Sequence, residues 1–119
     1  MARQPKEIIE KEKSFDLLDI RLGQIKKVEK IDIEDKKAYK LTIDFGKFGI
    51  KTSIGRFTNH SIEEILNKLV LGILNFEERI INGIKSEVLI LGVQYPKANS
   101  NEATFISPMA NAKIGSKVF

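Results

Sequence analysis

The stretch LDIRLGQI, residues 18–25, contains the pattern that decides the fold of this chain. Apolar side chains at positions 18, 20 and 22 alternate with the charged side chains of Asp19 and Arg21, as in a strand with one buried face. Gly23 ends this alternation, and the next large apolar residue, Ile25, lies on the opposite phase. A glycine at such a slip is typical of a bulge or a sharp bend in the first strand of a small barrel. The stretch therefore predicts a coiled strand that continues to about residue 29.

The next segment predicts a β-hairpin. In residues 39–53, apolar residues alternate with polar ones up to Phe45, and Gly46-Lys47 follows as a turn before a return strand. The charged residues 30–37 are predicted to connect the first strand to this hairpin. Further strands are predicted at residues 69–76, 87–93 and 103–108, with a turn at Asn82-Gly83 and a polar loop at residues 94–102.

One helix is predicted within NHSIEEILNKL, residues 59–69. Ser61 and Glu64 have the spacing of a capping box, and the apolar residues at 62, 65, 66 and 69 fall on one face. The order strand, hairpin, helix and two strands is that of an OB-fold, a five-stranded Greek-key barrel with a helix between strands three and four. The predicted fold class is therefore mainly all-β, with short helical segments near the chain ends.

Composition favours a single domain. The chain has 119 residues, of which 42% are hydrophobic and 30% are charged, as in ordinary globular proteins. We expect a polar N-terminal arm at residues 1–13 and one domain at residues 14–119. No apolar run approaches the roughly 20 residues of a membrane span, and the first residues lack the apolar core of a signal peptide. We therefore expect no membrane insertion. The absence of cysteine excludes disulfides and fits a cytoplasmic protein.

The sequence contains no pattern that predicts catalysis. His60 is the only histidine, and its position beside the helix start favours a structural residue over a metal ligand or a general base. The serines lie outside any nucleophile elbow, and GKFGIKTS lacks the spacing of a phosphate-binding loop. We therefore predict no enzyme activity, no catalytic residue, no metal and no cofactor.

Signals for binding are stronger than signals for catalysis. The formal net charge is +4, which permits binding to a polyanion. In an OB-fold, the exposed face of the second and third strands is the usual site for oligonucleotides. Lys and Arg would neutralise phosphates there, while Asn and Ser would contact bases and sugars. Two polar clusters are candidates: Lys51, Thr52, Ser53 and Arg56 after the hairpin, and Asn75, Arg79, Lys85 and Ser86 around the Asn82-Gly83 turn.

Two phenylalanines near these clusters have alternative roles. Phe57 and Phe76 could stack on bases, as aromatic side chains do in many RNA-binding proteins. Alternatively, both phenylalanines belong to the core. For Phe76, which ends the apolar run of residues 69–76, the core is the favoured interpretation.

Five blocks of the sequence resemble one family. The blocks LDIRLGQI, AYKLTIDFG, GIKTS, NFEERIINGIKSEVLILG and ISP with AKIGSKV occur in the order and spacing of the tRNA-binding OB-fold domain. This domain is found at the C-terminus of many methionyl-tRNA synthetases, in endothelial-monocyte-activating polypeptide II and in small free-standing proteins. The chain is most similar to the CsaA-type subgroup, described as export-related chaperones, over about residues 14–119.

The resemblance implies a homodimer that binds tRNA or other structured RNA, holds unfolded export precursors, and has no catalytic activity. The family's binding-face positions correspond here to residues 19–21, which include Arg21, and to Lys51, Ser53, Asn75, Arg79, Lys85, Ser86 and Ser107. Two departures from the family pattern affect charge. Glu77 and Glu78 would repel phosphate beside the proposed RNA face, whereas Arg56, followed by Phe57, adds a cation.

Three functions are open at this stage. The first is RNA binding. The second is a peptide-binding chaperone without a physiological RNA ligand, which needs an exposed apolar groove between subunits, lined by Ile80, Ile81, Ile84 and the Val118-Phe119 tail. The third is a dimerisation or docking module for an aminoacyl-tRNA synthetase, with residues 1–13 as the docking arm. For Arg21, a structural ion pair with Asp19 and a contact with RNA are both open.

Overall fold

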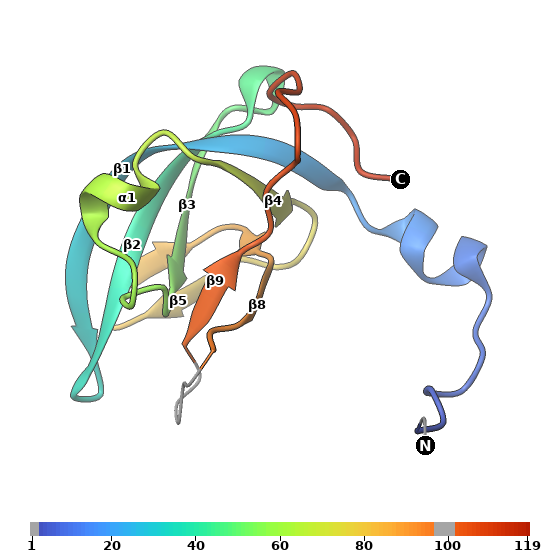
Figure 1. Ribbon diagram of the computed structural model, residues 1–119, viewed down its shortest axis with the longest axis horizontal. Coiled ribbons are helices and arrows are strands. Elements are labelled where there is room, and N and C mark those ends of the chain that lie inside the picture. Colours follow the sequence, from blue (N-terminus) through green and yellow to red (C-terminus); the bar gives the residue numbers. More distant parts are fainter. Residues whose placement is uncertain (1–2, 97–101) are drawn as a thin grey trace.

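The computed structural model describes residues 3–96 and 102–119 and contains a curved antiparallel sheet of five strands in the order β3-β2-β1-β4-β7 (Figure 1). These strands are β1 (Ile20–Ile33), β2 (Lys36–Asp44), β3 (Ile50–Gly55), β4 (Leu69–Ile73) and β7 (Leu89–Ile90). Two hairpins pair β5 (Arg79–Ile81) with β6 (Ile84–Ser86), and β8 (Gly92–Gln94) with β9 (Ala103–Phe105). A short helix, α1 (Ile62–Ile65), lies between β3 and β4, and 3-10 turns lie at Lys11–Lys13, Phe15–Leu17 and Gly46–Phe48. The predicted mainly β, OB-type fold is confirmed.

Strand β1 pairs with β4 along one edge and with β2 along the other. It pairs with β4 from Ile20 to Gln24 and with β2 from Gln24 to Ile33. The predicted bulge exists, but the register shift lies between Ile25 and Lys27 instead of at Gly23. Gly23 is buried, and a Cβ atom there would lie 2.6 Å from a methyl carbon of Ile43. The glycine therefore allows close packing of the core against β1, while the bulge that coils the strand comes after it.

The connector predicted at residues 30–37 is wrong. Strand β1 continues to Ile33 and β2 begins at Lys36, so a two-residue turn joins them. The turn residues Glu34 and Asp35 both have positive φ, 48° and 65°. Two left-handed residues match the twist of a tight hairpin, and this geometry is usually signalled by Asn or Gly. Because the turn contains neither Asn nor Gly, the charged residues 30–37 were interpreted as a loop.

Helix α1 is shorter than predicted. The capping box is present: the Glu64 amide donates to the Ser61 hydroxyl at 3.2 Å, and the Ser61 amide donates to the Glu64 carboxylate at 3.1 Å. The helix ends at Ile65, however, because Leu66 is extended and Asn67 has φ 68°. Ile65 is 2% exposed, so the single turn of helix contributes this side chain to the core.

The main core surrounds Phe45, which is completely buried at the end of β2. Phe57 also belongs to it and stacks on Phe105 with ring centroids 3.9 Å apart. Phe76 does not: it is 47% exposed, and the prediction that it is a core residue is wrong. The strand expected over residues 69–76 ends at Ile73, after which the chain leaves the sheet.

Further expectations concern the last third of the chain and its first residues. The strand predicted at residues 87–93 is divided between β7 and β8, and the strand predicted at residues 103–108 ends at Phe105. Residues 97–101 of the predicted polar loop, and residues 1–2 of the predicted arm, lie outside the described residues.

The C-terminal segment lies against the first half of β1. The Leu22 amide donates to the Ser116 carbonyl, and the amides of Gly115 and Val118 donate to the carbonyls of Leu22 and Ile20. This pairing brings residues 113–116 beside the turn between β2 and β3, at the top of the view in Figure 1. Two loops that are distant in sequence therefore meet at one end of the barrel.

Candidate nucleic-acid interface

The structure places three of the predicted binding residues together on the β5–β6 hairpin, beside β3. We call Arg79, Lys85 and Ser86 the hairpin face. Lys51 on β3 pairs across the sheet with the buried Ile43, so its side chain leaves the sheet on the same side as that of Ser53 and is not part of this face. Strand β3 contacts β6, and the Thr52 hydroxyl donates to the Lys85 carbonyl at 2.8 Å. The Ile54 amide donates to the Ser86 hydroxyl at 3.2 Å. These contacts fix the hairpin on the sheet, with Arg79 and Lys85 exposed.

The acidic residues beside this face reduce its positive charge. The Lys85 ammonium lies 3.9 Å from the Glu78 carboxylate, and both side chains are more than half exposed. An exposed pair of this kind stabilises the fold by only about 0–1 kcal/mol. The lysine can therefore leave the pair for a phosphate at small cost.

Ser53 does not lie on the exposed face, which corrects its assignment as a binding residue. It is 2% exposed and pairs across the sheet with Leu41, which is completely buried. Partners in an antiparallel pair point to the same face of the sheet. The Ser53 hydroxyl is thus directed to the core side, away from any ligand on the hairpin face.

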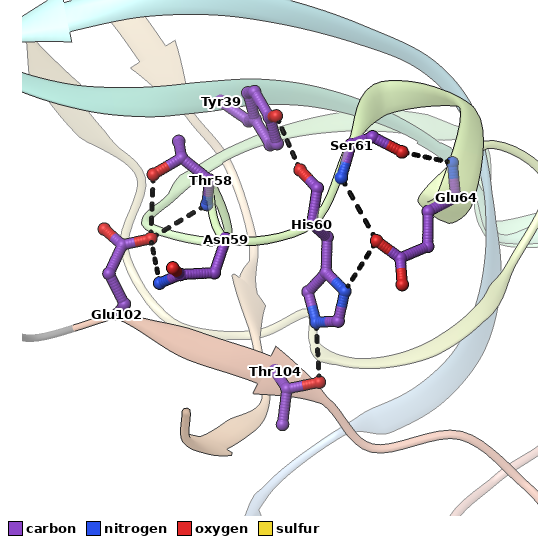
Figure 2. Close-up of polar contacts among 8 residues, drawn as sticks. All are labelled: Tyr39, Thr58, Asn59, His60, Ser61, Glu64, Glu102 and Thr104. Carbon is purple, nitrogen blue, oxygen red and sulfur yellow. Dashed lines mark hydrogen bonds and ion pairs between the residues drawn. The ribbon is translucent and has the colours of Figure 1, made fainter. Parts of the chain in front are cut away.

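Arg56 is held by a buried carboxylate. Its guanidinium lies 2.8 Å from Oε2 of Glu102, whose side chain is 6% exposed, in a charge contact that lacks hydrogen-bond geometry. The other carboxylate oxygen accepts from the Thr58 amide at 2.9 Å, the Thr58 hydroxyl at 2.8 Å and the Asn59 amide group at 3.4 Å (Figure 2). Arg56 is 27% exposed on its side chain, so its main partner within the protein is Glu102.

His60 links α1 to β9, as Figure 2 shows. Its Nε2 lies 2.8 Å from the Thr104 hydroxyl and its Nδ1 lies 3.1 Å from the Glu64 carboxylate. The hydrogen bond with His60, followed by the one from the Ser61 amide, lowers the pKa of Glu64. The Tyr39 hydroxyl donates to the His60 carbonyl at 2.7 Å, and burial, with the negative charges of nearby glutamates, raises the pKa of Tyr39. Through these contacts, His60 holds the segment before α1 against β9 and β2, which is a structural role.

Two more predicted binding residues bond to the protein's own backbone. The Asn75 side chain accepts from the Asp19 amide and donates to the Leu17 carbonyl, both at 2.8 Å. The Ser107 hydroxyl donates to the Leu69 carbonyl at 2.6 Å. Asn75 thereby attaches the segment before β1 to the chain after β4, a use of the amide that the sequence pattern did not indicate.

Arg21 lies at the start of β1, among residues that the sequence interpretation missed. Its Nε donates to Asp19 at 2.6 Å, and its guanidinium lies 4.4 Å from the centre of the Phe48 ring. The ammonium of Lys47 lies 5.4 Å from the same ring. Arg21, Lys47 and Lys113 line one pocket. The two lysines were not predicted as binding residues, because the turn between β2 and β3 and the C-terminal segment meet at Arg21 only in the folded chain.

The apolar residues proposed for peptide binding do not form one surface within a protomer. Ile80 on the β5–β6 hairpin is 63% exposed, and Phe119 at the C-terminus is fully exposed. Ile81 and Ile84 are half-buried. Figure 1 places the C-terminus away from β5, so one protomer does not bring Phe119 to the hairpin.

Within residues 3–96 and 102–119, no group of three or more His, Asp or Glu side chains could hold a metal ion. No helix in this described part of the chain has the length and apolar character needed to cross a membrane.

An OB-type barrel with exposed cations such as Arg79 and Lys85 on a hairpin is typical of small oligonucleotide-binding modules. Residues 20–117 match the model of the family described as "Putative tRNA binding domain", and the chain belongs to this family. Within this family of tRNA-binding OB-fold domains, its structural relatives show that it is of the CsaA type.

Those relatives are of two kinds. The CsaA chaperone of Picrophilus torridus is 32% identical with a TM-score of 0.82, covering 93% of this chain and 100% of its own. The CsaA chaperone of Bacillus anthracis is 28% identical with a TM-score of 0.80, covering 94% and 100%. Methionine–tRNA ligase of Archaeoglobus fulgidus is 30% identical over 104 residues, which are 87% of this chain and 15% of the ligase. The chain thus spans only a small part of the ligases it matches.

Proposed function

We propose that this protein is a CsaA-like homodimer of the cytoplasm that binds tRNA or other structured RNA and acts as a non-enzymatic chaperone in protein export. The observation that carries the RNA part is the family match over residues 20–117 together with the exposed cations of the hairpin face. Alignment with CsaA chaperones over their whole length supports the chaperone part. In this proposal, residues 1–13 are an arm and residues 14–119 form the RNA-binding domain.

The hairpin face contacts RNA mainly through phosphates. Arg79 presents a guanidinium that can hold two phosphate oxygens at once, and Lys85 acts as a point charge. The Ser86 hydroxyl accepts a hydrogen bond from the Ile54 amide and can still donate its own hydrogen to a phosphate or sugar oxygen. Arg56 and Asn75 keep their structural contacts and are secondary in this assignment.

The experiment is a titration of labelled tRNA by fluorescence anisotropy over a range of salt concentrations. Because each neutralised phosphate releases counterions, affinity should fall with salt, and Arg79→Ala should weaken binding about tenfold and reduce the log–log salt slope by about 1. Arg3→Ala is the matched control, since Arg3 is exposed and lies outside the family match. A flat salt response, or equal affinity for both variants, would contradict RNA binding at this face.

Exposed apolar residues at both chain ends support the homodimer. Ile8 is 94%, Ile9 is 71%, Leu17 is 64% and Phe119 is 100% exposed. Exposed apolar side chains of this kind mark interaction surfaces. Sedimentation equilibrium should give twice the mass of the 13.5 kDa chain. If the protein is a monomer that dimerises only when a synthetase is present, the docking-module alternative replaces this one.

The second candidate function is peptide binding without a physiological RNA ligand. A pocket of about 160 Å³ beside the hairpin face is lined by apolar side chains that include Ile54, Phe76, Ile81 and Leu89. Ile80 and Leu89 are 63% and 49% exposed, which favours contacts with an extended apolar segment.

An aggregation assay with an unfolded client tests this candidate. Ile80→Ser should raise the protein concentration needed for half-maximal suppression about tenfold, since one buried isoleucine contributes 1.4 kcal/mol or more. Ile50→Ser is the control, because Ile50 is 67% exposed, as Ile80 is 63%, but begins β3 and does not lie on the β5–β6 hairpin. Competition by tRNA would show that both ligands share one surface, whereas unchanged suppression by Ile80→Ser would exclude the hairpin as the peptide site.

A further inference from the structure

A groove lies between the turn that joins β2 to β3 and the C-terminal loop. Arg21, Lys47 and Lys113 line it together with Ile114 and Ser116, and its volume is about 390 Å³. We call this feature the C-terminal groove. Figure 1 shows the two loops side by side at the top of the barrel. The groove lies outside the hairpin face defined above.

The walls of the groove meet through glycine. Gly46 and Gly115 both have positive φ, 66° and 92°. A Cβ atom on Gly46 would lie 3.1 Å from the Ile114 carbonyl oxygen, and one on Gly115 would lie 3.0 Å from the Phe45 carbonyl oxygen. The two backbones therefore pack directly on each other, which keeps the groove open and holds the cations of both loops close together.

The Arg21 guanidinium is held in a fixed orientation at this groove. It lies on the face of Phe48, its Nε donates to Asp19 at 2.6 Å, and its Nη1 is 3.4 Å from the Gly115 carbonyl oxygen. These contacts engage two of the five N–H donors that a guanidinium carries. The side chain is 22% exposed, so the remaining donors can reach a ligand in the groove without losing much side-chain entropy.

Three lysines surround this arginine. Lys47 and Lys113 are exposed lining residues. Lys117 pairs with Arg21 in an antiparallel bridge, so both side chains leave the sheet on the same face. The nearby carboxylates already have partners: Asp19 binds Arg21, and Asp44 accepts from the Gly46 amide at 2.8 Å. None of the residues that line the groove is acidic.

We propose that the C-terminal groove binds the phosphodiester backbone of the RNA, with Arg21 as the fixed, two-pronged phosphate ligand and Lys47, Lys113 and Lys117 as point charges around it. This inference rests on the proposed RNA-binding function and adds a second phosphate-contacting surface to it. The charge of the groove favours a polyanion, and its apolar component is limited to Ile114 and the Phe48 ring beneath Arg21.

The test is the tRNA titration repeated with Lys47→Ala/Lys113→Ala. Loss of two phosphate contacts should weaken binding about 10- to 100-fold and reduce the log–log salt slope by about 1.5–2. The matched control is Lys26→Ala/Lys36→Ala, which removes two exposed lysines from β1 and β2 outside both surfaces. The control should keep the wild-type salt slope, because those lysines do not contact the RNA in this arrangement.

The outcomes separate this inference from the proposed function. If the wild-type protein binds tRNA and both double variants lose the same affinity, the groove assignment is wrong while RNA binding stands. If the wild-type protein shows no salt-dependent affinity, both fail. Arg21→Lys gives a second readout: the charge is retained but the two-pronged contact is lost, so affinity should fall with little change in salt slope. Wild-type affinity in that variant, with unchanged thermal unfolding, would overturn the role of Arg21.

Discussion

Phe45→Ala is expected to lower the free energy of unfolding by about 3–5 kcal/mol, the range for removing a buried aromatic side chain. Phe45 is completely buried and belongs to the main core cluster. Its ring fills the space above two glycines on neighbouring strands: Cβ atoms on Gly23 and Gly72 would lie 2.7 Å and 2.8 Å from its carbon atoms. Because neither glycine has a side chain to occupy the cavity, collapse around the missing ring cannot recover the lost contacts.

Urea unfolding followed by circular dichroism measures this loss. The matched control is Phe76→Ala, which removes the same side chain from a site that is 47% exposed and should change stability by about 1 kcal/mol or less. Gly72→Ala tests the geometry in a double-mutant cycle. It should destabilise the wild-type protein by about 1–3 kcal/mol through overpacking and have little effect when Phe45 is already alanine. Additive effects would show that the ring does not lie over Gly72.

Glu102→Ala is expected to cost about 2–4 kcal/mol of stability, since removing one partner of a buried ion pair leaves the other partner and its hydrogen-bond donors unpaired. The carboxylate side chain is 6% exposed and accepts from the Thr58 amide and hydroxyl and from Asn59. The value is below the full range for a buried pair because Arg56 is 27% exposed and can regain water. Thermal unfolding of the variant measures the change.

Variants of the same ion pair decide between two roles for Arg56. If the arginine is structural, Arg56→Ala lowers the melting temperature and leaves tRNA affinity near the wild-type value. The control is Glu102→Gln, which keeps the shape of the side chain and two of its acceptor positions while removing its charge. The double variant Arg56→Ala/Glu102→Gln should then be more stable than the two single changes predict, with a coupling energy of about 0.5–3 kcal/mol. Weakened tRNA binding with an unchanged melting temperature would instead make Arg56 a binding residue.

Local signals in the sequence predicted the elements that local contacts form. The capping box of Ser61 and Glu64 and the turn at Asn82-Gly83 are both present, because hydrogen bonds and φ angles within a few residues produce them. The tight turn at Glu34-Asp35 was not predicted, because no local signal in the sequence marks it. Its two residues adopt left-handed backbone angles without the residue types that normally signal them, and pairing of the long flanking strands holds them there.

Binding residues were harder to predict than strands. Arg79, Lys85 and Ser86 lie together on the β5–β6 hairpin, and their contact with RNA stays a prediction. Ser53, two positions from Lys51 and on the same face of β3, is buried because it pairs with Leu41 on the core side of the sheet, and the sequence does not reveal that register. Asn75 looked like a ligand-binding amide, yet it hydrogen-bonds to Leu17 and Asp19, more than fifty positions earlier.

The sequence alone determined the class of fold, the order of its elements and the family to which the chain belongs, because alternation, caps and turn dipeptides are properties of neighbouring residues. Only the tertiary structure decided which polar side chains remain available to a ligand. That choice depends on hydrogen bonds and ion pairs between distant segments, such as Arg56 with Glu102. It depends also on the C-terminal segment, which pairs with β1 and places Lys113 beside Arg21. A charged or amide side chain looks the same in sequence whether its partner is the protein itself or RNA, since long-range burial and register fix the partner.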